Sequence, residues 1–244
     1  RTQSTGVLRG VGRGQGRIAS LALLDLKLIL RNKRPRQMLG AGLLLIGPFL
    51  VILLLGKEVP PMNVVLFGFV LSGYLGLTYM QFGYAWHGAH FDGLLARAVA
   101  PRLLVQAQFV TFVGLCMAPL MLIVPVIAAV RPQLLASLGS FFLYNAGVTA
   151  PLFLVLGTWG RTALKLDQST FFNYQGTSTH HFLMVLPVMG LPIGLVVGVG
   201  LSPTLLVAAG LGLLGLVTVP LWTRGVSRLL RRQRHAMASG FRDK

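Results

Sequence analysis

The run LLLIGPFLVILLL at residues 43–55 decides the fold, because thirteen consecutive positions carry no charged side chain. With its flanks it forms an apolar stretch over 38–56, and a helix needs about 20 such residues to cross a bilayer core about 30 Å thick. The run does not alternate apolar and polar residues, as the strands of a membrane barrel would. It therefore predicts a membrane-spanning α-helix.

Five further apolar stretches have the same character. They lie at 62–82, 103–130, 133–156, 182–200 and 203–222, and none contains Asp, Glu, Lys or Arg within its apolar core. Only 11% of the 244 residues are charged and 54% are hydrophobic, whereas soluble domains carry roughly 25% charged residues. The sequence therefore predicts an all-α membrane protein, with a domain of six transmembrane helices over 38–222.

Lysine and arginine are unevenly distributed, and in membrane proteins they concentrate in the cytoplasmic loops. If the N-terminus is cytoplasmic, the cytoplasmic segments hold 20 of the 22 Lys and Arg residues, and the outer loops hold only Lys57 and Arg131. We therefore expect both termini on the cytoplasmic side. Because the charges flank apolar segments, the formal charge of +17 does not indicate nucleic acid as a partner.

The two ends of the chain differ from the apolar domain. Residues 1–16 are rich in Gly and Arg and predict a flexible basic linker. Because the sequence opens on Arg and lacks a signal-peptide layout, we expect it to be a piece of a longer polypeptide. Residues 17–37 (RIASLALLDLKLILRNKRPRQ) predict an amphipathic helix in the membrane interface, with its cations near anionic lipid. Residues 223–244 are expected to form a basic cytoplasmic tail.

The segment GYAWHGAHFDGLLARAVAPR at 83–102 is too polar to span and predicts a short cytoplasmic helix over 84–97. We expect this helix to expose aromatic side chains beside polar ones, as a docking surface for a partner would. The alternative is a helix folded back on the bundle. The candidate contact residues are Trp86, His87, Phe91, Asp92 and Leu94. A later cytoplasmic loop contributes the candidates Phe171, Phe172, Asn173, Tyr174 and Gln175.

Three glycines in the stretch 182–200 form two overlapping G-x-x-x-G steps: Gly190, Gly194 and Gly198. Such a face lets another helix approach closely. The partner helix belongs either to the same bundle, where this would be ordinary tight packing, or to a second subunit or half of the protein.

The sequence offers little catalytic or metal-binding chemistry. The histidine pairs 87/90 and 180/181 lack an HExxH motif and further carboxylates at ligand spacing, so we expect no metal site and no cofactor. The string DGLLAR at 92–97 matches the opening of the CDP-alcohol phosphotransferase signature. However, Ala89, Val110 and Gly114 stand where that signature needs further acids, and one carboxylate cannot hold two metal ions. We therefore expect no enzyme.

An energy source of the chain's own is also missing. There is no G-x-x-x-x-G-K-[ST] motif for binding ATP, and the apolar cores lack the ionisable residues that ion coupling usually needs. If the protein performs transport, another protein must supply the energy.

The predicted order of an interfacial helix, two spans, a cytoplasmic helix, four spans and a basic tail resembles one transmembrane domain of the ABC-2 superfamily of ATP-driven exporters. The strings LDLKLILRNKRPRQ, YAWHGAHFDGLLAR, FLYNAG, FFNYQGTSTHHFL and MASGFRDK look like the second half of an uncharacterised bacterial permease family assigned to these exporters. One departure is visible, because His87 and His90 stand where we expect an acid and an aromatic residue.

The resemblance implies a coupling helix at 84–97 that contacts an ABC-type ATPase subunit. It also implies a second six-helix bundle, either another copy of this chain or a missing N-terminal half, and a bacterial cytoplasmic membrane. The expected function is that of a permease subunit, or half-subunit, of an ATP-driven exporter. The alternative is a structural or assembly subunit of a larger membrane complex without its own transport pathway.

Overall fold

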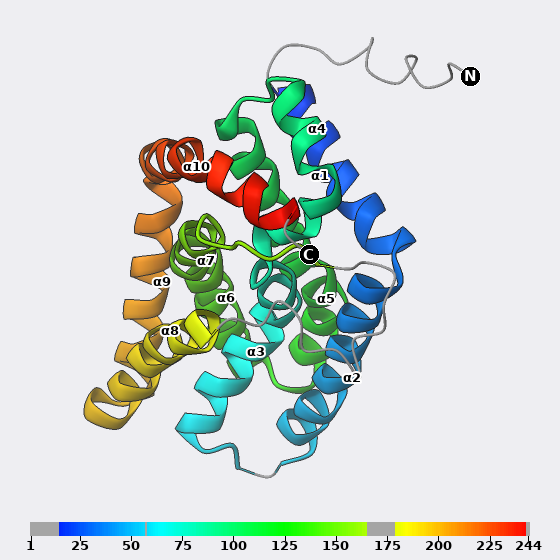
Figure 1. Ribbon diagram of the computed structural model, residues 1–244. Coiled ribbons are helices and arrows are strands. Elements are labelled where there is room, and N and C mark those ends of the chain that lie inside the picture. Colours follow the sequence, from blue (N-terminus) through cyan, green and yellow to red (C-terminus); the bar gives the residue numbers. More distant parts are fainter. Residues whose placement is uncertain (1–14, 57, 165–178, 243–244) are drawn as a thin grey trace.

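The computed structural model describes residues 15–56, 58–164 and 179–242, and every regular element within them is a helix. In chain order these are α1 (Gln15–Arg31), α2 (Lys33–Leu55), α3 (Pro61–Met80), the 3-10 helix η1 (Gly83–His90), α4 (Phe91–Ala96), α5 (Pro101–Val130), the 3-10 helix η2 (Pro132–Leu134), α6 (Leu135–Tyr144), the π-helix η3 (Asn145–Thr149), α7 (Ala150–Gly157), α8 (Thr179–Val199), α9 (Leu201–Val217) and α10 (Val219–Arg242) (Figure 1). The all-helical prediction is confirmed for this part of the chain.

The number of candidate spans is smaller than predicted. Four helices are long and apolar enough to cross a membrane, namely α2, α3, α5 and the helix Pro132–Gly157 that runs from η2 to α7. A fifth results if α9 and α10, which are bent by 68° to each other, are counted as one. In α8 (21 residues), the part whose side chains the structure describes, Leu186–Val199, forms an apolar helix. The structure therefore fits a multi-pass membrane protein with four or five candidate spans, and six spans are not confirmed.

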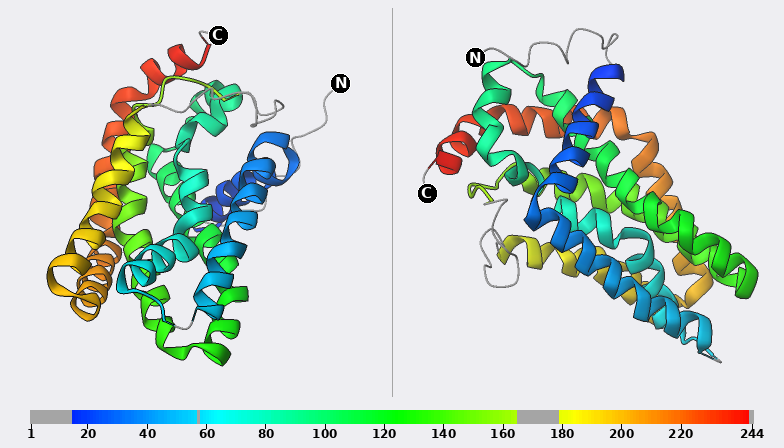
Figure 2. Two further views of the ribbon diagram at one scale, coloured as in Figure 1. Left: turned by 90° about the horizontal axis from the view of Figure 1, so that it is seen from below. Right: turned by 90° about the vertical axis from the view of Figure 1, so that its right-hand side faces the viewer.

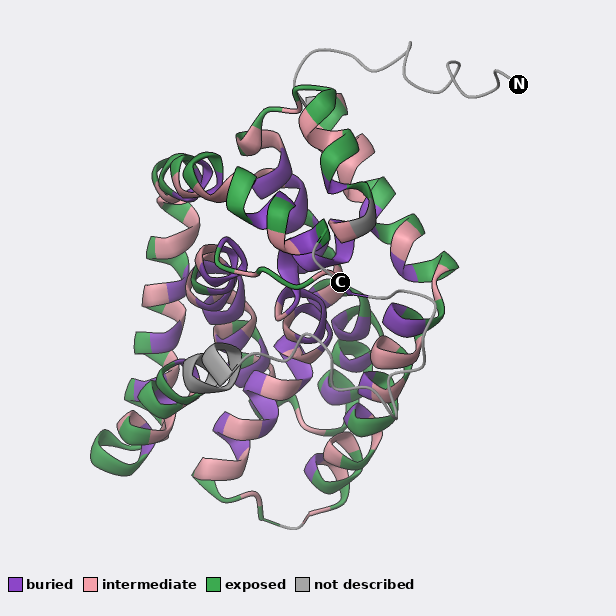
Figure 3. Ribbon diagram, in the orientation of Figure 1, coloured by how far each residue is buried: buried purple, intermediate pink, exposed green. Residues whose placement is uncertain are grey.

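Helix α3 lies at the centre of the bundle. In its most apolar stretch 67% of the residues are buried, against 17% in α2. Figure 3 shows the buried residues concentrated in α3, α6 and α7, while α2, α8 and α9 turn exposed faces outward. Leucine and valine dominate those outward faces. Because lipid tails are as apolar as leucine, such faces suit contact with lipid, and helix association must come from close packing and polar contacts.

Polar contacts join α3 to η3. The Asn145 amide donates hydrogen bonds to the carbonyl of Phe69 and the hydroxyl of Ser72, each at 3.1 Å. Glycines in α3 make room for its neighbours, because a methyl group at Gly73 would collide with the Asn145 side chain. One at Gly76 would collide with side chains of α5. Interhelical hydrogen bonds of this kind contribute about 0.6 kcal/mol each in membrane proteins.

The closest helix approach lies between η3 and α9. A Cβ atom at Gly147 would overlap the backbone of Gly212, and one at Gly215 would overlap the backbone of Gly147. Only glycine fits at these crossing points. Close packing at these three glycines was not predicted from the sequence.

The predicted glycine face is not packed in this way. Ideal Cβ atoms on Gly190, Gly194 and Gly198 would meet nothing within 4 Å among the described residues. The interpretation of this face as tight packing within the bundle is therefore wrong for the described part of the chain. The reason is that α8 turns its other face, with Val188 and Val196, towards the core. The alternative, an interface with a second bundle, stays a prediction.

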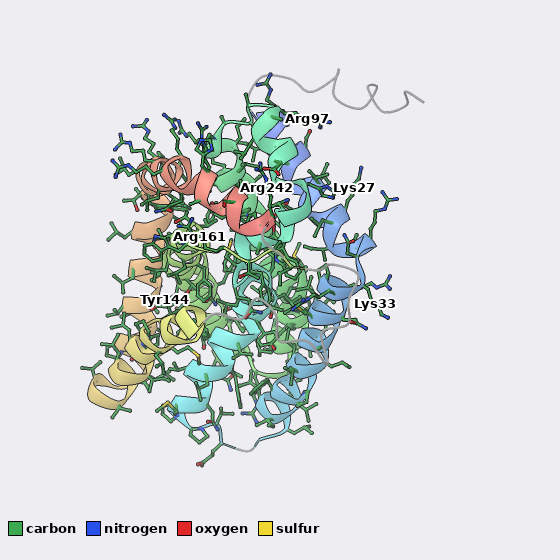
Figure 4. All side chains as sticks on the ribbon, viewed as in Figure 1. Lys27, Lys33, Arg97, Tyr144, Arg161 and Arg242 are labelled. Carbon is green, nitrogen blue, oxygen red and sulfur yellow. The ribbon has the colours of Figure 1, made fainter. Side chains whose placement is uncertain are left out.

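Helices α1, α4 and α10 gather at one end of the bundle, which we call the basic end (Figures 1 and 2). The connections α2–α3 and α5–α6 lie at the opposite end, where Arg131 donates a hydrogen bond to the Gly56 carbonyl. Figure 4 shows nitrogen-tipped side chains crowded around α10 and along α1. Among the residues whose side chains the structure describes, the basic residues are therefore concentrated towards one end, as the sequence predicted.

Three predicted boundaries need correction. The amphipathic helix expected over 17–37 ends at Arg31, and α2 begins at Lys33, so 32–37 belong to the join and the first turn of α2. The last span expected over 203–222 ends at Val217, where the chain bends. The expected basic tail over 223–244 is α10, an ordered amphipathic helix up to Arg242. Its apolar face packs against the bundle.

Candidate functional site

The junction that η1 and α4 form with α1, α5 and α10 is the candidate site, and we call it the basic-end junction. The chain enters it from α3 by a turn at Gly83, whose φ of +42° lies in the left-handed region. Glycine adopts this conformation without steric cost. This turn folds η1 back against the ends of α3 and α7, where a Cβ on Gly83 would lie 3.4 Å from Gly157.

Trp86 anchors η1 to the end of α3. Its ring stacks on Tyr79 with centroids 6.3 Å apart and planes at 8°, and it meets the edge of Phe82 at 5.1 Å. The indole N–H donates a hydrogen bond of 2.8 Å to the Tyr79 carbonyl. Trp86 is only 2% exposed. Burial of an aromatic side chain of this size is strongly favourable, so η1 is held firmly in place.

A buried contact between an imidazole and a carboxylate connects η1 to α1. His87 Nε2 lies 2.9 Å from Asp25 Oδ1, and the two side chains are 7% and 4% exposed. The Thr111 hydroxyl of α5 shares its proton between the other carboxylate oxygen, at 3.2 Å, and the Ala107 carbonyl, at 3.0 Å. Three helical segments distant in sequence therefore meet at one carboxylate. Charged groups are buried at acceptable cost only when paired and hydrogen-bonded in this way.

Further polar groups surround this pair. The Tyr79 hydroxyl approaches the carboxylate too loosely for a well-formed hydrogen bond. Burial, followed by the nearby Asp25 charge, raises the pKa of the Tyr84 hydroxyl. The Gln108 amide is 2% exposed and makes no hydrogen bond within the described residues.

A cavity of about 10 Å³ lies beside the pair. It is lined by Leu21, Leu24, Asp25, His87, Leu94, Leu104, Ala107 and Gln108. This volume suits one water molecule, which needs two to four polar partners. A water here would reach Gln108 and the Asp25–His87 pair.

Helix α4 is joined to the C-terminal end of α10 by two contacts. Phe91 packs edge-to-face on Phe241 with centroids 5.2 Å apart. The Arg242 guanidinium donates to both oxygens of Asp92 at 2.7 and 2.8 Å. The hydrogen bond from Arg242 holds the pKa of the Asp92 carboxyl below its usual range. Because this ion pair is exposed, it orients the two helices more than it stabilises them.

The predicted exposure of the aromatic contact residues is wrong. Trp86 and Phe91 are each 2% exposed and His87 is 5% exposed. The reason is that η1 and α4 fold back on the bundle, where α1, α3 and α10 cover these side chains. Of the remaining candidates, Asp92 is exposed and Leu94 is half-buried. A docking role for the segment is still a prediction, with a smaller available surface.

Other predicted and unpredicted residues complete the picture. Phe171, Phe172, Asn173, Tyr174 and Gln175 lie outside the described residues. Four residues of the junction were not among the predicted contacts, namely Asp25, Thr111, Phe241 and Arg242. One signal was available, because Asp25 is the only acid in the apolar run LALLDLKLIL at 21–30. A lone acid flanked by leucines indicates a buried partner.

Among the residues that the structure describes, no three His, Cys, Asp or Glu side chains lie together as a metal site requires. The His180 and His181 side chains lie outside that description.

Fold and junction together define a multi-helix protein with four or five candidate membrane spans and a polar junction at one end. The chain belongs to a family of unknown function (DUF5687), whose sequence pattern matches residues 13–244. No curated protein and no solved structure matches the chain. This family has no assigned activity, so the family match does not by itself identify an exporter.

Proposed function

We propose that this chain is a permease subunit, or half-subunit, of an ATP-driven exporter in a bacterial cytoplasmic membrane, with the basic end cytoplasmic. A separate ABC-type ATPase drives it through η1 and α4. The observation that carries the proposal is the position of η1–α4. This segment links the candidate spans α3 and α5 directly, and buried contacts tie it to α1 and α10.

A segment with these connections suits the transmission of a movement. The outer surface of α4 is exposed at Asp92, Gly93 and Arg97, where a cytoplasmic partner has access. On the inner side, Phe91 of α4 packs on Phe241 of α10, and one turn earlier His87 of η1 contacts Asp25 of α1. A push on α4 therefore moves α10 and α1 together with the ends of α3 and α5. ATP binding to the partner then shifts a two-state equilibrium of the bundle, to the extent that it favours one state.

The transport pathway requires a second bundle, which is another copy of this chain or an N-terminal half. The face formed by Gly190, Gly194 and Gly198 is open among the described residues and suits close approach by a helix of that bundle. The second bundle is inferred from this open face and from the sequence resemblance to ABC-2 exporters. Cross-linking of two bundles through cysteines introduced on α8 tests it separately.

The test uses Gly93→Trp, which adds a bulky side chain to the exposed surface of α4. Nothing lies within 4 Å of the Cβ position at Gly93, so the change blocks a partner without disturbing the fold. The matched control is Gly225→Trp on α10, another exposed glycine of the basic end with open space around its Cβ. The full-length protein is purified from native membranes, and the ATPase activity that accompanies it is measured.

We expect a P-loop ATPase to co-purify with the unmodified chain and with the control, and its ATP hydrolysis to respond to the chain. Gly93→Trp should remove that response at an unchanged melting temperature. If no ATPase accompanies the chain, or if its activity is the same with Gly93→Trp, the exporter assignment is wrong. The absence of an ATPase would favour a structural or assembly subunit instead.

A further inference from the structure

A stripe of exposed apolar residues begins at the end of α9 and, beyond the bend, meets one face of α10. Leu214, Val217 and Leu221 are 60%, 77% and 65% exposed. Within α10, the stripe follows one face from Leu221 to the exposed Arg224 and Arg228, and then to Arg231. Positions three or four residues apart share one face of a helix. The stripe therefore changes from apolar to cationic within one helical turn, which is about 5 Å of rise.

The bend between the two helices places this change at a fixed level of the molecule. Helix α10 leaves α9 at 68°, so if α9 runs along the membrane normal, α10 lies close to the membrane plane. Trp222 sits at the bend, where its N–H donates to the Gly215 carbonyl at 3.0 Å and its ring meets Phe109 at 5.2 Å. Tryptophan is enriched at membrane–water interfaces.

The opposite face of α10 prevents the helix from swinging away. Val226, Leu230, Met237, Ala238 and Phe241 are buried against the bundle. The arginine face therefore keeps its position at the edge of the basic end, as Figure 4 shows for the nitrogen-tipped side chains around the start of α10.

The arginines of this face have no counter-charge among the residues that the structure describes. Within the described residues, Arg224, Arg228, Arg231 and Arg232 make no ion pair and no side-chain hydrogen bond, in contrast to Arg242, which pairs with Asp92. The sequence of α10 contains no Asp or Glu. Four guanidinium groups within nine residues form a strong local field that attracts anions, and guanidinium binds phosphate through paired hydrogen bonds.

We propose that the arginine face of α10, formed by Arg224, Arg228, Arg231 and Arg232, binds the phosphate groups of anionic phospholipids. The apolar half of the stripe distinguishes lipid from a soluble anion or a nucleic acid, because neither of these would contact Leu214, Val217 and Leu221. A phospholipid offers both parts in the same order, with acyl chains against the leucines and its phosphate one turn further. The inference depends on the membrane position of α9 and not on the exporter function.

The test measures local lipid preference by tryptophan quenching. The full-length protein is reconstituted into vesicles of phosphatidylcholine that contain either brominated phosphatidylglycerol or brominated phosphatidylcholine. Trp222 reports on lipid at the arginine face, Trp86 is buried, and Trp159→Phe removes the exposed third tryptophan from every sample. The variant is Arg224→Gln with Arg228→Gln. The charge-matched control is Arg97→Gln with Arg102→Gln, two exposed arginines near α4.

We expect phosphatidylglycerol to quench Trp222 in preference to phosphatidylcholine, and the preference to weaken at high salt. The α10 variant should lose about fivefold in relative affinity for each arginine removed, since one basic residue near a membrane surface contributes about that factor. The control should keep the preference, and millimolar inorganic phosphate should not compete with the lipid.

Equal quenching by the two lipids in the unmodified protein would overturn the proposal. So would an equal loss in the α10 variant and the control, because that would indicate a general charge effect. Competition by inorganic phosphate would indicate a site for free anions. All samples should show the same melting temperature, since the replaced arginines are exposed and unpaired within the described chain.

Discussion

The Asp25–His87 pair makes the most direct prediction about what holds the basic-end junction together. The perturbation is replacement of His87 by Leu, which leaves the Asp25 carboxylate buried with only the Thr111 hydroxyl, 3.2 Å away, as an established hydrogen-bond donor. Removal of one member of a buried pair costs about 3–5 kcal/mol, because the other charge remains without compensation. For soluble domains of 150–250 residues, 1 kcal/mol corresponds to about 2–4 °C in melting temperature. We therefore expect His87→Leu to lower the melting temperature by about 6–20 °C.

The double variant distinguishes a true pair from two independent residues. With Asp25→Leu and His87→Leu together, no uncompensated charge is left, and such apolar replacements of buried pairs are often neutral or stabilising. The double variant should therefore regain most of the stability lost in either single variant. The result is a strong coupling energy in the double-mutant cycle.

The assay is provided by the chain itself. Cys116 is its single cysteine and is 1% exposed, so a thiol-reactive fluorescent dye reports unfolding without an added label. Asp92→Asn is the control, because it breaks an exposed ion pair and should leave the melting temperature unchanged. If the double variant were as unstable as the sum of both single variants, the two side chains would not be coupled, and the description of the junction would be wrong.

Three further predictions follow from the packing and the charges. Gly147→Ala should lower the melting temperature in the same dye assay by about 2–12 °C, since overpacking costs about 1–3 kcal/mol, whereas Gly190→Ala should have no effect. Phe241→Ala should free the end of α10 and increase its hydrogen exchange without affecting α9, because its main contact there is Phe91. The link between Asp92 and Arg242 should be fully formed above the ordinary aspartate pKa of about 3.9 and lost as the pH falls through the lowered value. Hydrogen exchange at the end of α10, corrected for the intrinsic rate, should therefore rise only at strongly acidic pH, and Arg242→Gln should abolish this dependence.

The sequence was sufficient to predict the helices but not how they end. Runs without charge, such as 43–55, do form helices, because in lipid a helix satisfies its own backbone groups. Pro220 near the end of the last apolar run favours a kink, but the 68° bend at Thr218 could not be predicted because hydropathy carries no information about direction. Similarly, the open face at Gly190 and the crowded one at Gly147 have the same kind of sequence. Which of them meets a partner depends on the rotation of each helix about its axis.

The candidate site, too, could be predicted from the sequence only in part. The segment around Trp86 was recognised from its composition, but exposure was inferred from the position of the segment between two spans. The structure buries it because residues 62 positions apart, Asp25 and His87, approach to 2.9 Å and fix η1 against α1. No local pattern encodes a contact of this range. The lone acid among leucines was the available indication, and its partner becomes identifiable only in the folded chain.

The π-helix η3 has a consequence for how this chain tolerates changes in length. A π turn holds one more residue than an α turn, so the five residues Asn145–Thr149 contain a surplus position between α6 and α7. Deleting one residue there would restore a regular helix and leave both flanks facing their present neighbours. A deletion elsewhere in Pro132–Gly157 would rotate everything beyond it by about 100°. Insertions and deletions among relatives should therefore accumulate at this turn, provided that the Asn145 amide keeps its partners on α3.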